Sequence, residues 1–133
     1  MPSASEAYVQ RIFEEERARF MAAFPRMPDV RLAVRDRHYR VRGVDARDLA
    51  WYDIGGRTVY ILRSAFSRSD GAIRGILRHE LGHAADVDVG KKGSEARADR
   101  LALLATGVPV RYTADGVQHA THGQPGRPGW LHR

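Results

Sequence analysis

The stretch from residue 78 to 99, RHELGHAADVDVGKKGSEARAD, constrains the fold of this chain more than any other segment. His79 and His83 are four residues apart, and so are Glu95 and Asp99. Residues at this spacing share one face of an α-helix, roughly 40° apart around its axis. The turn-forming letters GKKG separate the two pairs. The sequence therefore predicts two helices that fold against each other with four polar side chains between them.

The two histidines form the pattern H-E-x-x-H, in which Glu80 follows the first histidine. Two imidazoles on one helical turn can reach the same ion, and Glu80 can contact a water molecule on that ion. Because the chain has no cysteine, its metal ligands must be nitrogen and oxygen atoms. We therefore expect Zn²⁺ on His79 and His83, with Glu80 as general base. Gly82 is expected to leave room beside the metal.

A catalytic zinc ion needs a third protein ligand and one open position. We expect Glu95 to be that ligand, while Asp99 accepts the spare N–H of a ligating histidine. Two alternatives stay open: Asp99 is the ligand instead, or Glu95 is an ordinary first-turn acid that interacts with the helix dipole. Asp86, three residues after His83, is either a polar helix-end residue or a hydrogen-bond partner of a ligand.

Apolar residues at helical spacing predict three helices. The first follows an S-x-x-E capping box formed by Ser3 and Glu6. The second covers about residues 72–86 and carries the two histidines, with a neighbouring apolar stripe that faces the core. The third begins after a Ser94 cap and ends at Gly107.

Alternating apolar residues predict strands between the first two helices. DVRLAVRD, residues 29–36, reads as a half-buried strand, and HYRVRGV, residues 38–44, as a weaker one. DLAWYDIGGRTVYIL, residues 48–62, reads as a hairpin whose Gly55-Gly56 loop supplies positive φ. The order of elements predicts an α+β fold, with the histidine helix packed on a small, antiparallel-rich sheet.

The chain of 133 residues is long enough for one hydrophobic core but not for two. We assign residues 1–114 to a single domain and residues 115–133, which are rich in Gly and Pro, to a flexible tail. No run of 18 apolar residues and no signal peptide are visible, so we expect a cytoplasmic protein without membrane contact. The charge of +6 comes from scattered arginines, which gives a nucleic-acid partner only weak support.

The pattern H-E-x-x-H followed by E-x-x-x-D resembles the gluzincin group of zinc metallopeptidases. The segments HELGHA, residues 79–84, and SEARAD, residues 94–99, are similar to the corresponding segments of compact zincins of phage and bacterial origin. These include ImmA/IrrE-like and anthrax-toxin-like peptidase domains. The resemblance implies a zinc ion held by His79, His83 and Glu95, with Glu80 as the base. It also implies that residues 57–62 form an edge strand that binds extended substrate by strand addition.

The implied activity is hydrolysis of peptide bonds, on a specific intracellular protein. In that reaction Glu80 takes a proton from a zinc-bound water and delivers it to the leaving amine. Tyr112 is the expected hydrogen-bond donor to the oxyanion, and His119 and His122 are weaker candidates. Small size and basic charge favour a phage or mobile-element origin.

A hypothesis from another class is a small basic module that binds nucleic acid or protein and has a structural metal site. Such a site is closed by a fourth protein ligand, for instance His119 or Asp86, and leaves Glu80 without a role. The substitution Glu80→Gln separates the two hypotheses. In a peptidase, this variant keeps its zinc but no longer turns over substrate. In a binding module, the substitution changes neither metal binding nor partner binding.

Overall fold

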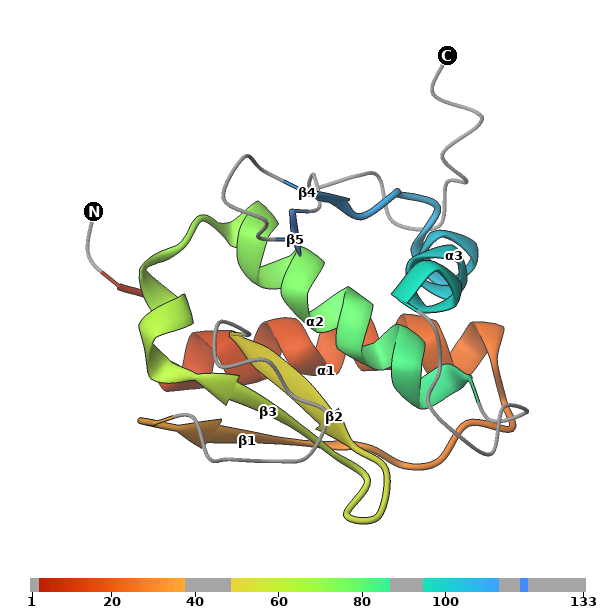
Figure 1. The fold of residues 1–133 in the computed structure, drawn as a ribbon, viewed down its shortest axis with the longest axis horizontal. Coiled ribbons are helices and arrows are strands. Elements are labelled where there is room, and N and C mark those ends of the chain that lie inside the picture. Colours follow the sequence, from red (N-terminus) through yellow and green to blue (C-terminus); the bar gives the residue numbers. More distant parts are fainter. Residues whose placement is uncertain (1–2, 38–48, 87–94, 113–117, 120–133) are drawn as a thin grey trace.

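The computed structural model describes residues 3–37, 49–86, 95–112 and 118–119. It confirms the α+β class, because three α-helices and a small three-stranded sheet pack together (Figure 1). The weak strand expected at residues 38–44 and the expected Ser94 cap lie outside the described residues. The elements are α1 (Glu6–Ala23), β1 (Arg31–Arg35), β2 (Ala50–Asp53), β3 (Thr58–Leu62), the 3-10 helix η1 (Arg63–Ser67), α2 (Asp70–Ala85), α3 (Glu95–Thr106), β4 (Arg111–Tyr112) and β5 (Gln118–His119).

The sheet differs from the expected one in its strand order, which is β1-β3-β2. The hairpin strands β2 and β3 are antiparallel, as expected, but β1 pairs in parallel with β3. The sheet is therefore mixed, because β1 joins the second strand of the hairpin rather than the first. The expectation that residues 57–62 form an edge strand is wrong, since β3 has a partner on each side.

The hairpin turn also differs from the expected two-residue glycine loop. Four residues, 54–57, separate β2 from β3, and the positive φ of 50° belongs to Arg57. Gly56 instead lies close to the side chain of Asp53. A Cβ atom at Gly56 would lie 2.6 Å from Oδ2 of Asp53, so a larger residue there would require the Asp53 carboxylate to move.

The core lies between the sheet and the helices, where the expected apolar faces meet. Val59 and Ile61 of β3 are fully buried, and so are Leu77 and Leu81 of α2. The α1 helix adds Val9, Ile12, Phe13 and Phe20. Among the described residues, no helix is long and apolar enough to cross a membrane.

Helix ends follow local side-chain chemistry, with one correction. Ser5 rather than Ser3 caps α1, because its Oγ accepts the N–H of Tyr8 at 3.1 Å. Ser69 caps α2, because its Oγ accepts the N–H of Ala72 at 3.2 Å. Gly107, at a φ of 75°, ends α3 as expected.

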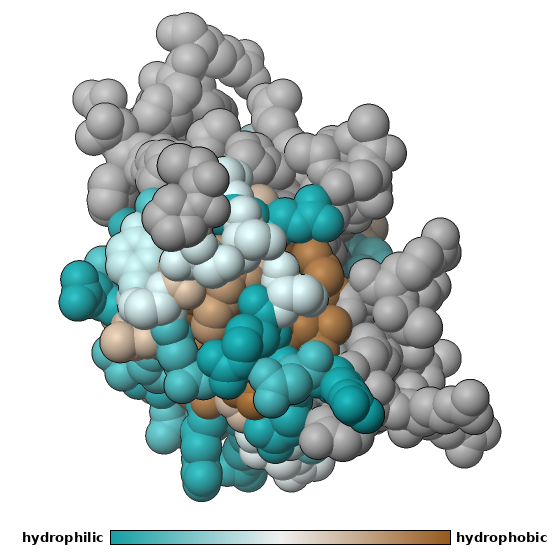
Figure 2. Space-filling model, turned by 90° about the vertical axis from the view of Figure 1, so that its left-hand side faces the viewer, coloured by the Kyte–Doolittle hydropathy of each residue, from teal (hydrophilic) through white to brown (hydrophobic). Residues whose placement is uncertain are grey.

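β4 and β5 form a second, two-stranded pairing, and β5 lies against α2 (Figure 1). Gln118 and His119 belong to the segment that the sequence assigns to the tail. The end of the molecule where η1 lies presents mainly hydrophilic residues, with a band of apolar surface between them (Figure 2). Helix α2 runs through the centre of this arrangement and contacts α1, α3 and the sheet.

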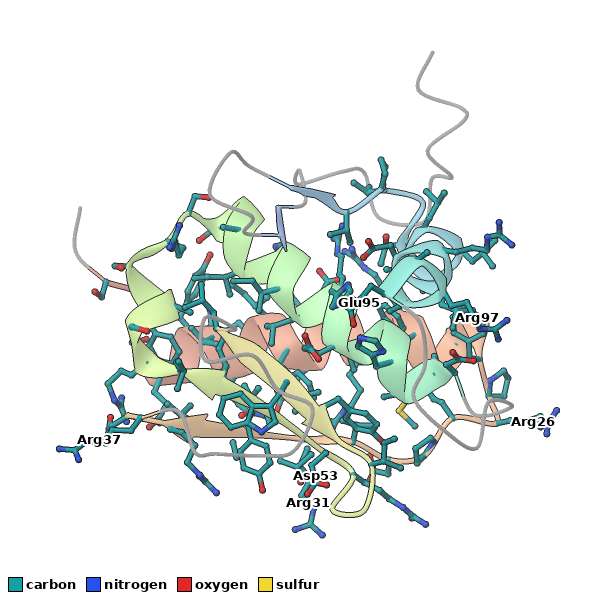
Figure 3. All side chains as sticks on the ribbon, viewed as in Figure 1. Arg26, Arg31, Arg37, Asp53, Glu95 and Arg97 are labelled. Carbon is teal, nitrogen blue, oxygen red and sulfur yellow. The ribbon has the colours of Figure 1, made fainter. Side chains whose placement is uncertain are left out.

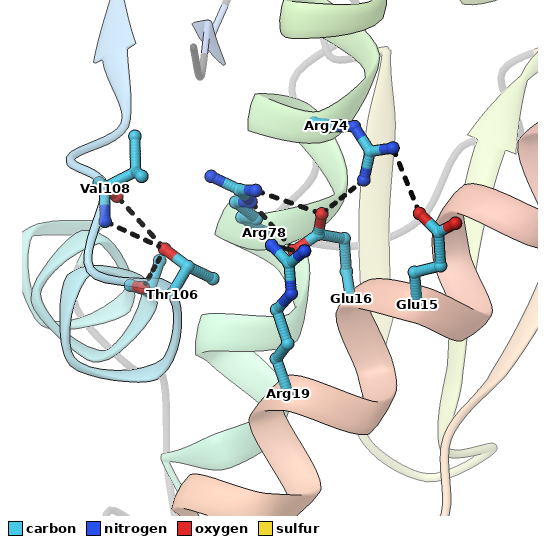
Figure 4. Close-up of polar contacts among 8 residues, drawn as sticks. Glu15, Glu16, Arg19, Arg74, Arg78, Thr106 and Val108 are labelled. Atoms are coloured by element: carbon cyan, nitrogen blue, oxygen red, sulfur yellow. Dashed lines mark hydrogen bonds and ion pairs between the residues drawn. The ribbon is translucent and has the colours of Figure 1, made fainter. Parts of the chain in front are cut away.

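A buried group of charges, which is not expected from the sequence, joins α1 to α2 (Figure 4). The Glu16 side chain is fully buried and accepts hydrogen bonds from Nε and Nη2 of Arg78 at 2.9 and 3.0 Å. Nη1 of Arg74 donates to the same carboxylate at 2.6 Å. Since Arg78 is also buried, Glu16 compensates a cation that water cannot reach.

We predict that Glu16→Ala lowers the free energy of unfolding by about 3–5 kcal/mol, because it leaves the Arg78 charge buried without its partner. Urea denaturation followed by circular dichroism measures the change. Glu15→Ala is the matched control, since half-exposed Glu15 accepts a hydrogen bond from Arg74 on the outside of the same group. Its loss should cost less than about 1 kcal/mol. Equal losses in the two variants would contradict the role assigned to Glu16.

Candidate metal centre

The three side chains expected from the sequence to bind a metal converge between α2 and α3; they are His79, His83 and Glu95. Nε2 of His79 lies 3.2 Å from Nε2 of His83. The Glu95 carboxylate closes the triangle, with Oε2 at 2.6 Å from His79 Nε2 and Oε1 at 3.0 Å from His83 Nε2. Ligands bound to tetrahedral zinc at about 2.0–2.1 Å are separated by about 3.3 Å. The atoms of His79, His83 and Glu95 could therefore hold one metal ion.

Asp99 lies behind the first histidine rather than in this triangle. Its Oδ1 accepts from Nδ1 of His79 at 2.6 Å, on the opposite side of the imidazole from Nε2. This hydrogen bond orients the ring and directs Nε2 towards His83 and Glu95. The arrangement favours Glu95 over Asp99 as the third ligand, and Glu95 is also the ligand expected from the sequence.

The site lies at the edge of the core and opens towards solvent on the α3 side. The His79 side chain is only 1% exposed, whereas Glu95 is 73% exposed. Figure 3 shows Glu95 at the start of α3, next to α2. The α2 side of the site, with His79, is therefore fixed in the core, whereas the α3 side, with Glu95, is accessible to water and to a ligand.

The charges around the two histidines shift their pKa values in opposite directions. Burial alone lowers the pKa of His79, but the negative charge of Glu80, the hydrogen bond to Asp99 and the α3 carboxylates outweigh it, so this pKa is raised. Burial and the neighbouring His79 lower the pKa of His83, against the attraction of Glu95. The raised pKa of His79 means that the surrounding carboxylates favour a positive charge on this imidazole. A metal ion bound to Nε2 of His79 would take the place of the proton there.

Glu80 is buried on α2, and its charge acts directly on His79. Asp86 forms the C-cap of α2, and its carboxylate accepts two hydrogen bonds from Arg97 of α3, at 2.7 and 3.0 Å. It is therefore a helix-end residue that contacts α3, the first of the two roles considered for it. These hydrogen bonds hold the pKa of Asp86 below its usual range.

The three candidate oxyanion donors are only partly covered by the described structure. Tyr112 belongs to β4 and His119 to β5, where the backbone alone is described. His122 lies outside the described residues. The assignment of Tyr112 as donor stays a prediction.

Gly82, which is expected to leave room beside the metal, lies against the backbone of Ala98 in α3. A Cβ atom there would lie 2.8 Å from the carbonyl carbon and 2.9 Å from the Cα atom of Ala98. Only glycine lets the two backbones come so close. The small residues of HELGH and SEARAD carried this signal, since a Gly and an Ala at facing positions permit close helix packing.

Comparisons with protein-family models, with curated proteins and with solved structures find no match for this chain. The function of the site must therefore be inferred from its own residues.

We predict that the purified protein binds about one zinc ion per chain. His83→Ala and Glu95→Ala should abolish stoichiometric binding, because each removes one of three ligands. Asp99→Ala should weaken binding by about 10–100-fold, since it removes only the partner of His79. Metal content after dialysis and a competition titration with a chelator measure both effects.

Glu6→Ala is the matched control, because Glu6 is also an exposed acid in the first turn of a helix. It should leave zinc binding unchanged. Retention of metal by Glu95→Ala, together with its loss in Asp99→Ala, would reverse the assignment of the third ligand.

Proposed function

We propose that this protein is a zinc-dependent metallopeptidase of the gluzincin type. The observation that carries the proposal is the convergence of His79 Nε2, His83 Nε2 and the Glu95 carboxylate, with Asp99 behind His79. Two imidazoles and one carboxylate, with a second carboxylate that orients an imidazole, form a donor set that suits catalytic zinc.

Zinc bound by these residues would supply a water molecule of lowered pKa and polarise the substrate carbonyl. Glu80 holds the proton in this reaction: its carboxylate accepts it from the water and returns it to the leaving amine. The position of Glu80 supports this role, because it follows the first ligand on α2 and its charge acts on that imidazole. Asp99 keeps His79 in the orientation that leaves Nε2 free to bind.

The alternative, a structural site, needs a fourth protein ligand. Among the described residues, the group that could hold an ion consists of His79, His83 and Glu95. Asp86, one of the two residues considered for the fourth position, is engaged by Arg97. The high exposure of Glu95 leaves one side of the site open to water, which favours catalysis over a closed structural centre.

We propose an extended peptide segment as the substrate. Strand addition to β3 is excluded, because β3 is paired on both sides. Of the two outer strands in the described part of the sheet, β2 packs against α2, which carries both histidines. A peptide paired with β2 would therefore run beside the proposed catalytic helix.

Glu80→Gln should retain the zinc stoichiometry of the wild type and lower the rate of peptide hydrolysis by about 10²–10⁴-fold, because the amide cannot accept the proton. Zinc-loaded protein and variant would be incubated with a library of unstructured peptides, and the products identified by mass spectrometry. Glu15→Gln is a control for the same chemical change away from the site. Cleavage by Glu80→Gln at the wild-type rate would overturn the proposed mechanism.

A further inference from the structure

One face of α2 meets the first five residues of α3 through four successive contacts. The α2 residues lie at positions 79, 82, 83 and 86, which is the spacing of a single helical stripe. Two contacts belong to the proposed metal centre and two do not. The pairs are His79 with Asp99, Gly82 with Ala98, His83 with Glu95, and Asp86 with Arg97.

The Gly82 contact fixes the separation of the helices. Carbon atoms that are not bonded prefer separations of about 3.5–4.0 Å. A methyl group at Gly82 would lie 2.8 Å from the carbonyl carbon of Ala98, so α3 would have to move away by at least about 0.7 Å. Metal–ligand distances tolerate only about 0.2 Å. The separation allowed by Gly82 therefore decides whether Glu95 reaches both histidines.

The ion pair between Asp86 and Arg97 joins the end of α2 to the turn of α3 that carries Glu95. A carboxylate at a helix C-terminus opposes the helix dipole, so Asp86 requires a compensating charge. Arg97 supplies it with two hydrogen bonds from a position two residues after Glu95. First turns of helices lack half of their backbone hydrogen bonds, and this ion pair ties the first turn of α3 to the end of α2.

We propose that Gly82 and the Asp86–Arg97 pair are positioning elements for the third metal ligand. Gly82 sets the distance between α2 and α3, and the ion pair anchors the turn that carries Glu95. The inference rests on the metal site of the proposed function, but it does not depend on peptide hydrolysis.

The test compares Co²⁺ binding by the wild type, Gly82→Ala and Arg97→Gln, with Arg100→Gln as the matched control. Arg100 is an exposed arginine on the same helix. Gly82→Ala should bind Co²⁺ at least about tenfold more weakly, with a changed visible absorption spectrum because the ligand geometry changes. Arg97→Gln should weaken binding about threefold, as expected for a partly exposed ion pair, and Arg100→Gln should not weaken it.

A second readout needs no metal. In the metal-free protein, Gly82→Ala should shift the low-field proton resonance of the 2.6 Å hydrogen bond between His79 and Asp99. Wild-type Co²⁺ affinity and an unshifted resonance in Gly82→Ala would overturn the role of Gly82. So would failure of this variant to fold, which would make Gly82 a folding residue. Equal affinities of Arg97→Gln and Arg100→Gln would overturn the role of the ion pair.

These outcomes are distinguishable from failure of the proposed function. A wild-type protein that binds Co²⁺ with the expected variant pattern but cleaves no peptide would refute the peptidase and leave the positioning role intact.

Discussion

The close contact between α2 and α3 at Gly82 and Ala98 is the constraint on which the candidate site depends. Neither helix contains the site alone, because the imidazoles come from α2 and the carboxylates from α3. Helical spacing aligns each pair along its own helix, but only the approach of the two backbones brings nitrogen and oxygen atoms to hydrogen-bond distance. A steric property of one residue without a side chain thus determines the geometry of the charged ones.

Helix α2 is held from two directions by consecutive residues. Arg78 reaches the buried Glu16 of α1, and His79 faces Asp99 and Glu95 of α3. Successive residues differ by about 100° around a helix, so these two anchors fix its rotation as well as its position. A buried ion pair adds little net stability compared with an apolar contact, but it tolerates little displacement. The Glu16 group therefore gives the proposed metal ligands a rigid support.

The parts of the structure that follow from local spacing could be predicted from the sequence. The i, i+4 pairs placed His79, His83, Glu95 and Asp99 on facing helices, and the apolar pattern of residues 48–62 predicted the antiparallel hairpin. The parts that depend on distant pairing could not. The sequence of β3 does not show that β1 pairs with it in parallel. The residues around Glu16 do not show that its carboxylate binds two arginines about 60 residues later in the chain. The contact between Gly82 and Ala98 also depends on the packing of a second helix, so spacing within α2 alone does not reveal it.

The unequal burial of the three proposed ligands has a thermodynamic consequence. Two of them belong to a helix in the core, and the third is an exposed carboxylate on a helix that joins from outside. An ion shared by both helices and the docking of α3 must favour each other by the same factor, since linkage between two equilibria is reciprocal. Any event that loosens α3 from α2 would lower zinc affinity, and any supply of zinc would tighten that attachment. The fraction of protein with zinc bound would therefore depend on how firmly α3 is docked on α2.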